Sequence, residues 1–358
     1  MSDNHRRYSS IREALCKLLG NPQGRAMKQL NVLAAMISGI VGSKHTHYPK
    51  IACKVPDHTK PESRIKRFSR FINDVDEEQM VHFTPFAQAL LTALAENSLV
   101  LVMDGSEVGR KCLALMMSVI YRGRALPIAW IVVKGSKGHF PETMHIKLLE
   151  KVHEMVPTSA DVIFLGDGEF DGMSLQATLD GYSWEYVCRT ASNTILSQND
   201  EEFSYQSLSL HPGERLSLPD MFFTRQHYGP VLAIGWWRTG CQEPIYLVTN
   251  MDLPEEACHW YQKRFHIETF FSDQKGRGFH IDKSHLSAPA RIARLLVAAC
   301  LAYIWVVYLG VTAKTQGLDK IIHRTDRCDW SLFQMGLHLL EYLLNHDMAI
   351  PVAFTVPV

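Results

Sequence analysis

The pattern of apolar and polar positions divides the chain into helical ends and a middle rich in strands. Apolar residues recur every three or four positions in residues 11–19 and 30–40, which predicts two amphipathic helices separated by a Gly/Pro turn. Residues 81–94 predict a further apolar helix. Short apolar runs bounded by turn residues then predict an antiparallel meander of three strands, at 99–103, 112–121 and 124–133.

After this meander, helical and strand-like segments alternate. The predicted order is helix, strand, helix and strand, at 143–155, 161–165, 172–179 and 184–189. Three antiparallel strands followed by this alternation indicate an α/β fold, with a mixed sheet of the ribonuclease H type flanked by helices. Residues 190–256 interrupt the order with a polar stretch and then strand-like runs, which predicts a β-rich insertion with strands at 222–225, 231–237 and 244–249.

The C-terminal part begins with a helix over 261–275 and contains an unusually apolar segment. Residues 295–311 carry no charge over 17 positions, which is the lower edge of the length that spans a bilayer. Arg291 and Arg294 precede this segment, and no second such segment exists in the sequence. We therefore expect a buried helix packed on the sheet and no membrane association. An amphipathic helix is predicted over 330–344.

Bulk composition is that of a soluble globular protein, with 46% apolar and 21% charged residues and a net charge of zero. The charge is unevenly distributed: residues 1–98 carry a net +5, 99–256 a net −8 and 257–358 a net +3. An acidic middle between basic flanks fits a carboxylate-rich metal site with polyanion-binding arms, or segments that neutralise one another. The eight cysteines form no CxxC pair, and the N-terminus has no secretory signal, so we expect a cytoplasmic protein.

One stripe of the predicted helix 261–275 carries side chains suited to phosphate chemistry. At 100° per residue, Tyr261, Arg264, Glu268 and Lys275 fall within about 60° of one another over about 21 Å. A carboxylate flanked by cations suits a metal-bound phosphodiester. The alternative is a solvated helix face with an ordinary i,i+4 ion pair. The opposite face is predicted to pack on the core through Phe265, Ile267 and Phe270.

Two aspartates directly follow apolar strands and give Glu268 possible partners. Asp104 follows the run LVLVM, and Asp167 follows VIFLG. Three converging carboxylates repel one another unless cations bind between them, and hard oxygen ligands suit Mg²⁺. Two such ions can clamp the attacking and leaving oxygens of a phosphoryl transfer. Taken singly, each aspartate fits a turn or a helix cap equally well.

The segment 61–71 predicts a strongly basic helix that begins with a proline. Its apolar face is formed by Ile65, Phe68 and Phe71. The remaining surface presents the cations Arg64, Lys66, Arg67 and Arg70. This helix suits the backbone of duplex DNA, and it equally suits the solvated face of an ordinary amphipathic helix.

The spacing Tyr-x2-Arg-x3-Glu-x6-Lys at 261–275, preceded by two strand-end aspartates, resembles the DDE transposases of bacterial insertion sequences, in the insertion sequence four-like superfamily. The run GDGEFDG around Asp167 resembles the segment that carries the second acidic residue in this family. The resemblance implies that Asp104, Asp167 and Glu268 bind two Mg²⁺ ions, with Mn²⁺ as a substitute. It implies that Tyr261, Arg264 and Lys275 bind transposon-end DNA beside the scissile phosphate.

The same resemblance implies an organisation and a mechanism. In some members a Trp of the insertion stacks on a flipped base, and the candidates here are Trp236 and, preferred, Trp237. The implied reaction is cleavage at terminal inverted repeats followed by attack of the 3′-OH on target DNA, by a homodimer on paired ends. We expect a helical DNA-binding domain at 1–98 and a C-terminal helical segment at 312–358. Between them lies a catalytic core in two parts, 99–189 and 257–311, separated by the β-rich insertion at 190–256.

Two other functions remain open at this point. A transposase-derived regulator would bind DNA without catalysis, although such a protein has no physical need of three carboxylates. Another ribonuclease H-like nuclease, acting on junctions or RNA hybrids, would keep the carboxylates and act on a different substrate.

Overall fold

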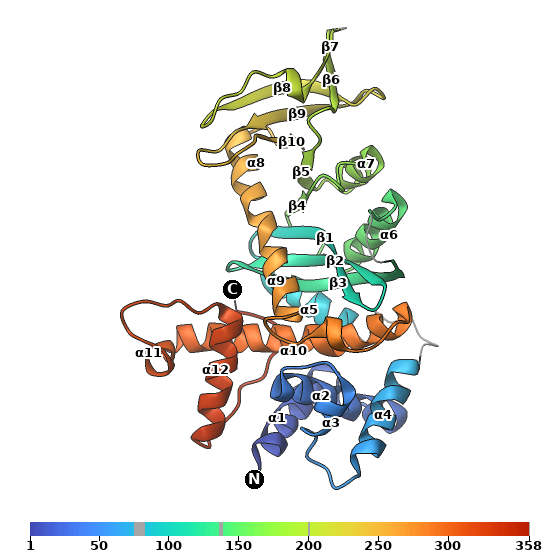
Figure 1. Ribbon diagram of the computed structural model, residues 1–358, viewed down its shortest axis with the longest axis vertical. Helices are drawn as coiled ribbons and strands as arrows, with labels where there is room; N and C mark the ends of the chain where they lie inside the picture. The colour runs from blue at the N-terminus through green and yellow to red at the C-terminus, as the bar shows by residue number, and fades with distance from the viewer. Residues whose placement is uncertain (75–82, 136–138, 200, 358) are drawn as a thin grey trace.

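The computed structural model describes residues 1–74, 83–135, 139–199 and 201–357. Four helices form a layer at the N-terminal end of the molecule (Figure 1): α1 Asp3–Leu18, α2 Gly24–Ser43, α3 Tyr48–Ala52 and α4 Pro61–Asn73. The next described helix, α5 Thr84–Leu94, lies apart from this layer and packs beside the sheet. The apolar spacing predicted α1, α2 and α4 at the correct places. Of the helix predicted over 81–94, positions 81 and 82 lie outside the described residues.

A single mixed sheet runs through the rest of the molecule, in the order β3-β2-β1-β4-β5-β10-β9-β8-β6-β7. Its first half is formed by β1 Leu99–Gly109, β2 Cys112–Tyr121, β3 Arg124–Lys134, β4 Val162–Gly166 and β5 Glu185–Thr190. The first three strands are antiparallel, whereas β4 pairs in parallel with both β1 and β5. A three-stranded meander extended by parallel strands through helical crossovers is the ribonuclease H-like arrangement that the sequence predicted.

The β-rich segment after β5 continues this sheet. Its last strand, β10, pairs antiparallel with β5, so the strands of this segment extend the first half of the sheet edge to edge. The strands are β6 Ile195–Gln198, β7 Glu201–Ser204, β8 Arg215–Phe223, β9 Tyr228–Trp236 and β10 Ile245–Thr249. The hairpin β6–β7 lies in a stretch that looked merely polar, because both strands are short and their side chains only partly buried. Strand β8 begins seven positions before the predicted 222–225 run and ends inside it.

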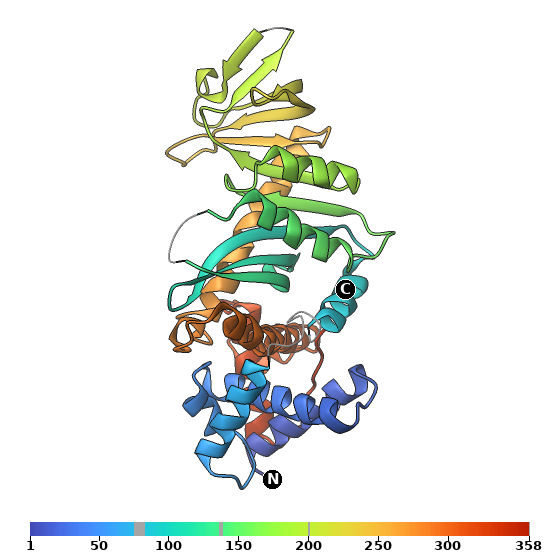
Figure 2. The ribbon, with the colours of Figure 1, turned by 90° about the vertical axis from the view of Figure 1, so that its right-hand side faces the viewer.

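Helices cover both faces of the sheet. Figure 2 shows α6 Glu142–His153 and α7 Met173–Gly181 on one side, and α8 Pro254–Tyr261 with α9 His266–Gln274 on the other. Short 3-10 turns at Tyr205–Ser207, Gln262–Phe265 and Ile281–Lys283 connect elements. The turn at Gln262–Phe265 separates α8 from α9, so the single helix predicted over 261–275 is in fact two helices with a tighter turn between them.

The long helix α10, Pro289–Thr315, lies between the sheet and the N-terminal helices (Figures 1 and 2). Among the described residues it is the one helix long and apolar enough to cross a membrane, and 94% of its most apolar window is buried inside the protein. It is followed by α11 Asp319–Ile322 and α12 Leu332–Asn345. Helix α12 crosses α10 closely, since a methyl group added at Gly336 would overlap the Val306 carbonyl oxygen. This packing agrees with the core helix expected from the sequence.

Candidate active site

The two predicted aspartates lie at equivalent positions on neighbouring strands. The parallel pairing of β1 with β4 ends at Val102 and Leu165, and Asp104 and Asp167 each lie two positions beyond that pair. Strand β1 was expected to end before Asp104, but it continues to Gly109 through its pairing with β2. Asp104 is accessible from the β4 side because β4 has already ended. The sheet register alone therefore brings the two carboxylates together.

The third carboxylate and a guanidinium come from the turn and helix that cross this edge. Arg264 Nη1 lies 3.6 Å from Asp104 Oδ2 and 3.8 Å from Asp167 Oδ2. Its Nη2 donates a hydrogen bond of 3.1 Å to Glu268 Oε1. Arg264 is 7% exposed, whereas the Glu268 side chain is 58% exposed. One buried guanidinium thus contacts all three predicted carboxylates.

The charges at this site are not balanced, because three carboxylates share one guanidinium. Burial, followed by the nearby charge of Asp167, raises the pKa of Asp104 to about 6, and Arg264 and a hydrogen bond from Gly105 N only partly oppose this. When all are ionised, three carboxylates and one guanidinium leave two excess negative charges. A divalent cation would neutralise that excess.

The donor chemistry fits a hard divalent cation, although the side chains are not gathered around a common point. No group of three His, Cys, Asp or Glu side chains within the described ranges is arranged to hold a metal ion. The carboxylate oxygens are the ligands that such cations prefer. The residues that could hold one are Asp104, Asp167 and Glu268, and Arg264 now lies among them.

Lys275 and Tyr261, the ends of the predicted stripe, occupy different environments. Lys275 ends α9, and its Nζ donates a 2.7 Å hydrogen bond to Ser106 Oγ on β1, next to Asp104 along the strand. Burial lowers the pKa of Lys275, and the nearby Glu107 opposes that shift. Tyr261 is 2% exposed, and burial raises its pKa to about 12. Phe265, expected in the core, is instead 46% exposed, whereas Ile267 and Phe270 are buried as predicted.

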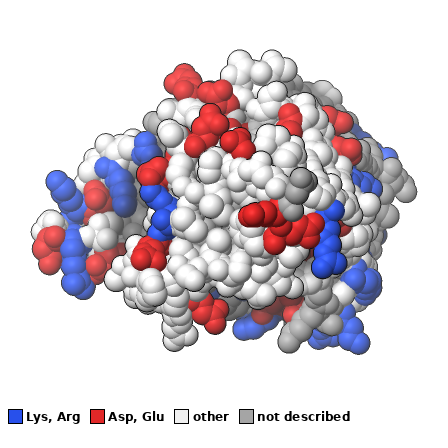
Figure 3. Space-filling model, turned by 90° about the horizontal axis from the view of Figure 1, so that it is seen from above, with Lys and Arg blue, Asp and Glu red and all other residues white. Residues whose placement is uncertain are grey.

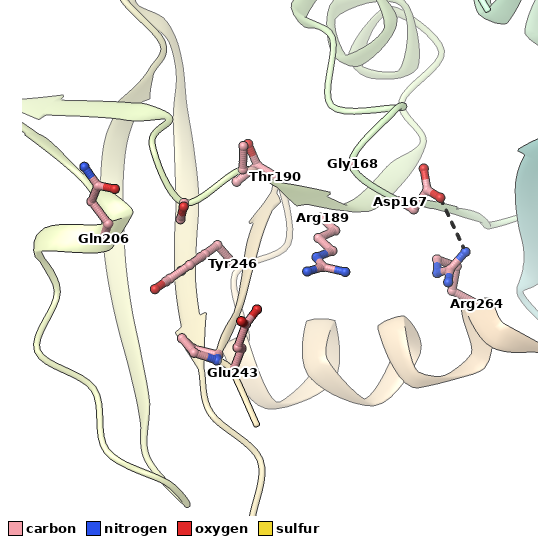
Figure 4. A pocket seen from close by; sticks show the side chains of 11 residues that line it. Asp167, Gly168, Arg189, Thr190, Gln206, Glu243, Tyr246 and Arg264 are labelled. Carbon is pink, nitrogen blue, oxygen red and sulfur yellow. Dashed lines mark ion pairs between the residues drawn. The ribbon is translucent and has the colours of Figure 1, made fainter. Parts of the chain in front are cut away.

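An open pocket of about 630 Å³ adjoins this cluster (Figure 4). Asp167 and Arg264 form one end of it, and Arg189 and Tyr246 line it farther along. In Figure 4 the guanidinium of Arg189 lies between Tyr246 and the Asp167–Arg264 pair. Arg189 follows Cys188, which pairs with Gly166, so it neighbours Asp167 across the sheet. The polar residues among the rest of the lining are Thr190, Ser192, Gln206 and Glu243.

Trp237 does not line this pocket. Its indole Nε1 donates a 3.0 Å hydrogen bond to the Cys241 carbonyl oxygen, beyond the end of β9. Trp236 is partly buried and packs against the core, with Arg238 5.3 Å above its ring. The aromatic side chain that does line the pocket is Tyr246.

The basic helix forms as predicted, but two of its four cations are engaged internally. Arg64 and Arg67 both pair with Asp57, at 2.6 and 2.5 Å. Against the opposing effect of burial, the hydrogen bonds from Thr59 and from these two cations hold the Asp57 pKa well below its usual range. Lys66 and Arg70 are exposed. Seen from the opposite end of the molecule, the surface carries both acidic and basic side chains, which adjoin one another in several places (Figure 3).

Three residues of this region were not anticipated: Ser106, Arg189 and Tyr246. Arg189 was placed at the end of a strand, and the register with Asp167 is the signal that could have identified it. Ser106 and Tyr246 carry no such signal, since each depends on contacts between segments far apart in the sequence.

A family model described as "Transposase DDE domain" matches residues 97–305, more than half of the chain. The chain belongs to this transposase family. The matched DDE domain includes the whole sheet, Arg264 and all three carboxylates. Among solved structures, the DDE chain is similar to one described as "Cryo-EM structure of piggyBac transposase synaptic complex with hairpin DNA", at 12% identity and a TM-score of 0.47. That alignment covers 95% of this chain and 79% of the other, and it is too distant to support a functional assignment. No curated protein matches the sequence.

Proposed function

We propose that this DDE family member is a cut-and-paste DNA transposase of the insertion sequence four-like group, acting on duplex DNA at transposon ends. The observation that carries the proposal is the convergence of Asp104, Asp167 and Glu268 on one guanidinium at the sheet edge. The complete Tyr-x2-Arg-x3-Glu-x6-Lys spacing supports the group assignment. A DNA-binding regulator would not need three converging carboxylates, so this geometry favours the enzyme.

In this proposal the carboxylates hold two Mg²⁺ ions, which would activate the attacking water or 3′-OH and stabilise the leaving oxygen. Arg264 exchanges its carboxylate partners for a phosphate next to the scissile bond, since guanidinium groups bind phosphate oxygens in a bidentate manner. Lys275, tethered through Ser106 to the strand of Asp104, contributes a second cation. Tyr261 is protonated at neutral pH, as an ordinary tyrosine is, and burial raises its pKa further, to about 12. Formation of a phenolate nucleophile is thereby disfavoured, which supports a positioning role.

The pocket supports a site for a flipped base. Tyr246 provides an aromatic face, and Gln206 and Thr190 provide polar groups beside the catalytic edge. Extrusion costs least at a duplex end, where only one neighbour stacks. We therefore propose Tyr246 in place of Trp237 as the stacking residue, with Arg189 on the adjoining phosphate. Pairing of two ends by a homodimer is part of the same proposal.

Replacement of Glu268 tests the enzymatic function directly. Glu268→Gln should fold normally, because the side chain is 58% exposed and its one described contact is Arg264. The assay uses a plasmid carrying the gene with its native flanking DNA, and it measures strand cleavage and end binding in Mg²⁺. We expect Glu268→Gln to bind transposon ends without cleaving them. The control variant Glu150→Gln, on the exposed surface of α6, should cleave normally. Cleavage by Glu268→Gln at the wild-type rate would exclude the assigned triad.

A further inference from the structure

Four histidine rings meet where the N-terminal helices contact the segment after Lys275. The His45 and His280 rings stack with centroids 5.1 Å apart, and the His47 and His285 rings lie edge to face at 4.7 Å. Thr46 Oγ1 donates a 3.0 Å hydrogen bond to the His280 carbonyl oxygen. These contacts join the α2–α3 connection to residues 276–288, which directly follow the predicted DNA-binding lysine.

Exposed cations surround these rings. Arg110 donates a 2.9 Å hydrogen bond to His285 Nδ1, and its backbone N–H bonds the Leu286 carbonyl oxygen at 3.1 Å. Lys50 acts electrostatically on both His45 and His47, and Lys283 acts on His45. We call the exposed or half-exposed members of this group the junction patch: Lys50, Arg110, Lys283, His47 and His285.

The junction patch lacks local neutralisation. Across the described part of the chain, no carboxylate forms an ion pair with Lys50, Arg110 or Lys283. Burial and then neighbouring positive groups lower the pKa of His45 to about 4 and also lower that of His47. The nearby carboxylates Glu107 and Asp282 act electrostatically on Lys275 instead, although Asp282 directly precedes Lys283 in the chain. Exposed cations that are held together without ion-pair partners create a local positive potential that attracts a polyanion.

Strand β1 connects the junction patch to the catalytic edge. Asp104 lies within β1, and Arg110 follows its last residue, Gly109. Six residues of strand span about 20 Å. Phosphates along one strand of B-DNA are about 3.4 Å apart, so this length corresponds to roughly six base pairs.

We propose that the junction patch binds the phosphate backbone of duplex DNA roughly six base pairs from the scissile bond. This inference rests on the proposed function, and it assigns a partner to a surface that the transposase signature does not include. The patch combines side chains from the N-terminal helices, β1 and the segment after Lys275. DNA bound there would therefore clamp the N-terminal layer against the catalytic sheet.

The test measures binding of a duplex of mixed sequence, about 40 base pairs long, by fluorescence anisotropy at several KCl concentrations, because binding through phosphate contacts depends on salt. The patch variant combines Lys50→Gln, Arg110→Gln and Lys283→Gln. The matched control combines Lys147→Gln on α6, Lys314→Gln at the end of α10 and Lys320→Gln on α11, which replace three exposed cations. Both variants remove the same charge, and thermal melting of each checks that the fold is retained.

We expect the slope of log K against log salt to fall by about 0.9 for each lost phosphate contact, so by nearly 3, which extrapolates from 1 M to a loss of affinity of roughly five hundredfold near 0.1 M salt. The control should change neither quantity comparably. Equal behaviour of the two variants would overturn the proposal, as would a hydroxyl-radical footprint that is unchanged six positions from the cleaved bond. Single Arg110→Lys, which keeps the charge, should retain affinity.

The outcomes separate this inference from the proposed function. If wild-type protein cleaves transposon ends and the patch variant binds DNA normally, the patch assignment fails alone. If the patch variant loses DNA affinity and wild-type protein never cleaves in Mg²⁺, the enzymatic proposal fails and the surface assignment stands.

Discussion

Removal of Arg264 should destabilise the folded protein, because the three carboxylates would repel one another without a shared cation. Arg264→Gln leaves Asp104 and its neighbours without their shared cation. A unit-charge pair at about 4 Å interacts by about 4 kcal/mol at an effective dielectric constant of 20, and breaking a buried pair typically costs about 3–5 kcal/mol. The Asp104 side chain is 19% exposed, but those of Asp167 and Glu268 are 34% and 58% exposed, so their contributions are strongly screened. We therefore expect a loss of about 2–3 kcal/mol in the free energy of unfolding.

The assay is a double-mutant cycle measured by urea unfolding at pH 8 in EDTA. Its variants are Arg264→Gln, Asp104→Asn and the combination of both. Since the double variant removes both charges of the best-buried pair, it should be more stable than the sum of the single effects predicts, by about 2 kcal/mol. The exposed pair Arg215–Glu255 provides the matched control cycle, with a coupling of at most about 1 kcal/mol.

Addition of Mg²⁺ extends this test to the cation site. A cation that binds the folded state stabilises it by mass action, and Arg264 competes with it for the same oxygens. At equal Mg²⁺ concentration, Arg264→Gln should therefore gain more stability than the wild-type protein, and Asp104→Asn should gain less. The assignment of Arg264 as the shared counter-ion would be refuted if the unfolding free energies of the Arg264→Gln and Asp104→Asn variants were additive. It would also be refuted if Mg²⁺ stabilised Arg264→Gln and the wild-type protein equally.

Two further predictions concern the pocket and a buried ion pair. Tyr246→Ala should reduce excision of transposon ends by about 5- to 150-fold, because the lost base stacking is worth about 1–3 kcal/mol. Trp237→Ala should remain near wild type, and the reverse order would restore the tryptophan assignment. Burial raises the pKa of Asp273 to about 6 despite its ion pair with Arg124, which lies 2.9 Å away. Because the folded pKa exceeds the unfolded value of about 3.9, the folded state binds more protons between these values, and stability falls as pH rises through them. The stability of Asp273→Asn relative to wild type should thus increase by about 2–3 kcal/mol from pH 4 to pH 7 in urea unfolding; a constant difference would contradict the raised pKa.

The first half of the sheet and its helices, at 99–190, could be predicted because each of these elements has its own pattern of apolar residues in the sequence. Strand β2 begins and ends where the apolar run predicted, and β3 extends one residue beyond its predicted end. Elements outside that half gave weaker signals. The hairpin β6–β7 is short and half exposed, and β8 alternates so weakly that seven of its positions were missed. Their stability comes from pairing with distant strands, which no local pattern records.

The roles of the cations could not be predicted, since a charged side chain has no fixed partner in sequence. Arg64 and Arg67 looked like surface cations, yet both bind Asp57, which precedes their helix. Arg189 looked like an ordinary strand end, yet it neighbours Asp167 across the sheet. In both cases the deciding contact is set by tertiary structure.

The candidate site itself depends on a break in the helix that sequence periodicity assumed to be continuous. Each residue of a 3-10 turn advances about 120° rather than 100°, so the four residues Gln262–Phe265 rotate helix α9 by roughly 80° relative to α8. On a continuous helix, Tyr261, Arg264 and Glu268 would share one exposed stripe. With the turn, Tyr261 and Arg264 point inward, Phe265 points outward, and Glu268 remains accessible at the rim. The turn thus places a buried cation beneath an exposed carboxylate, which is why Arg264 contacts all three acids.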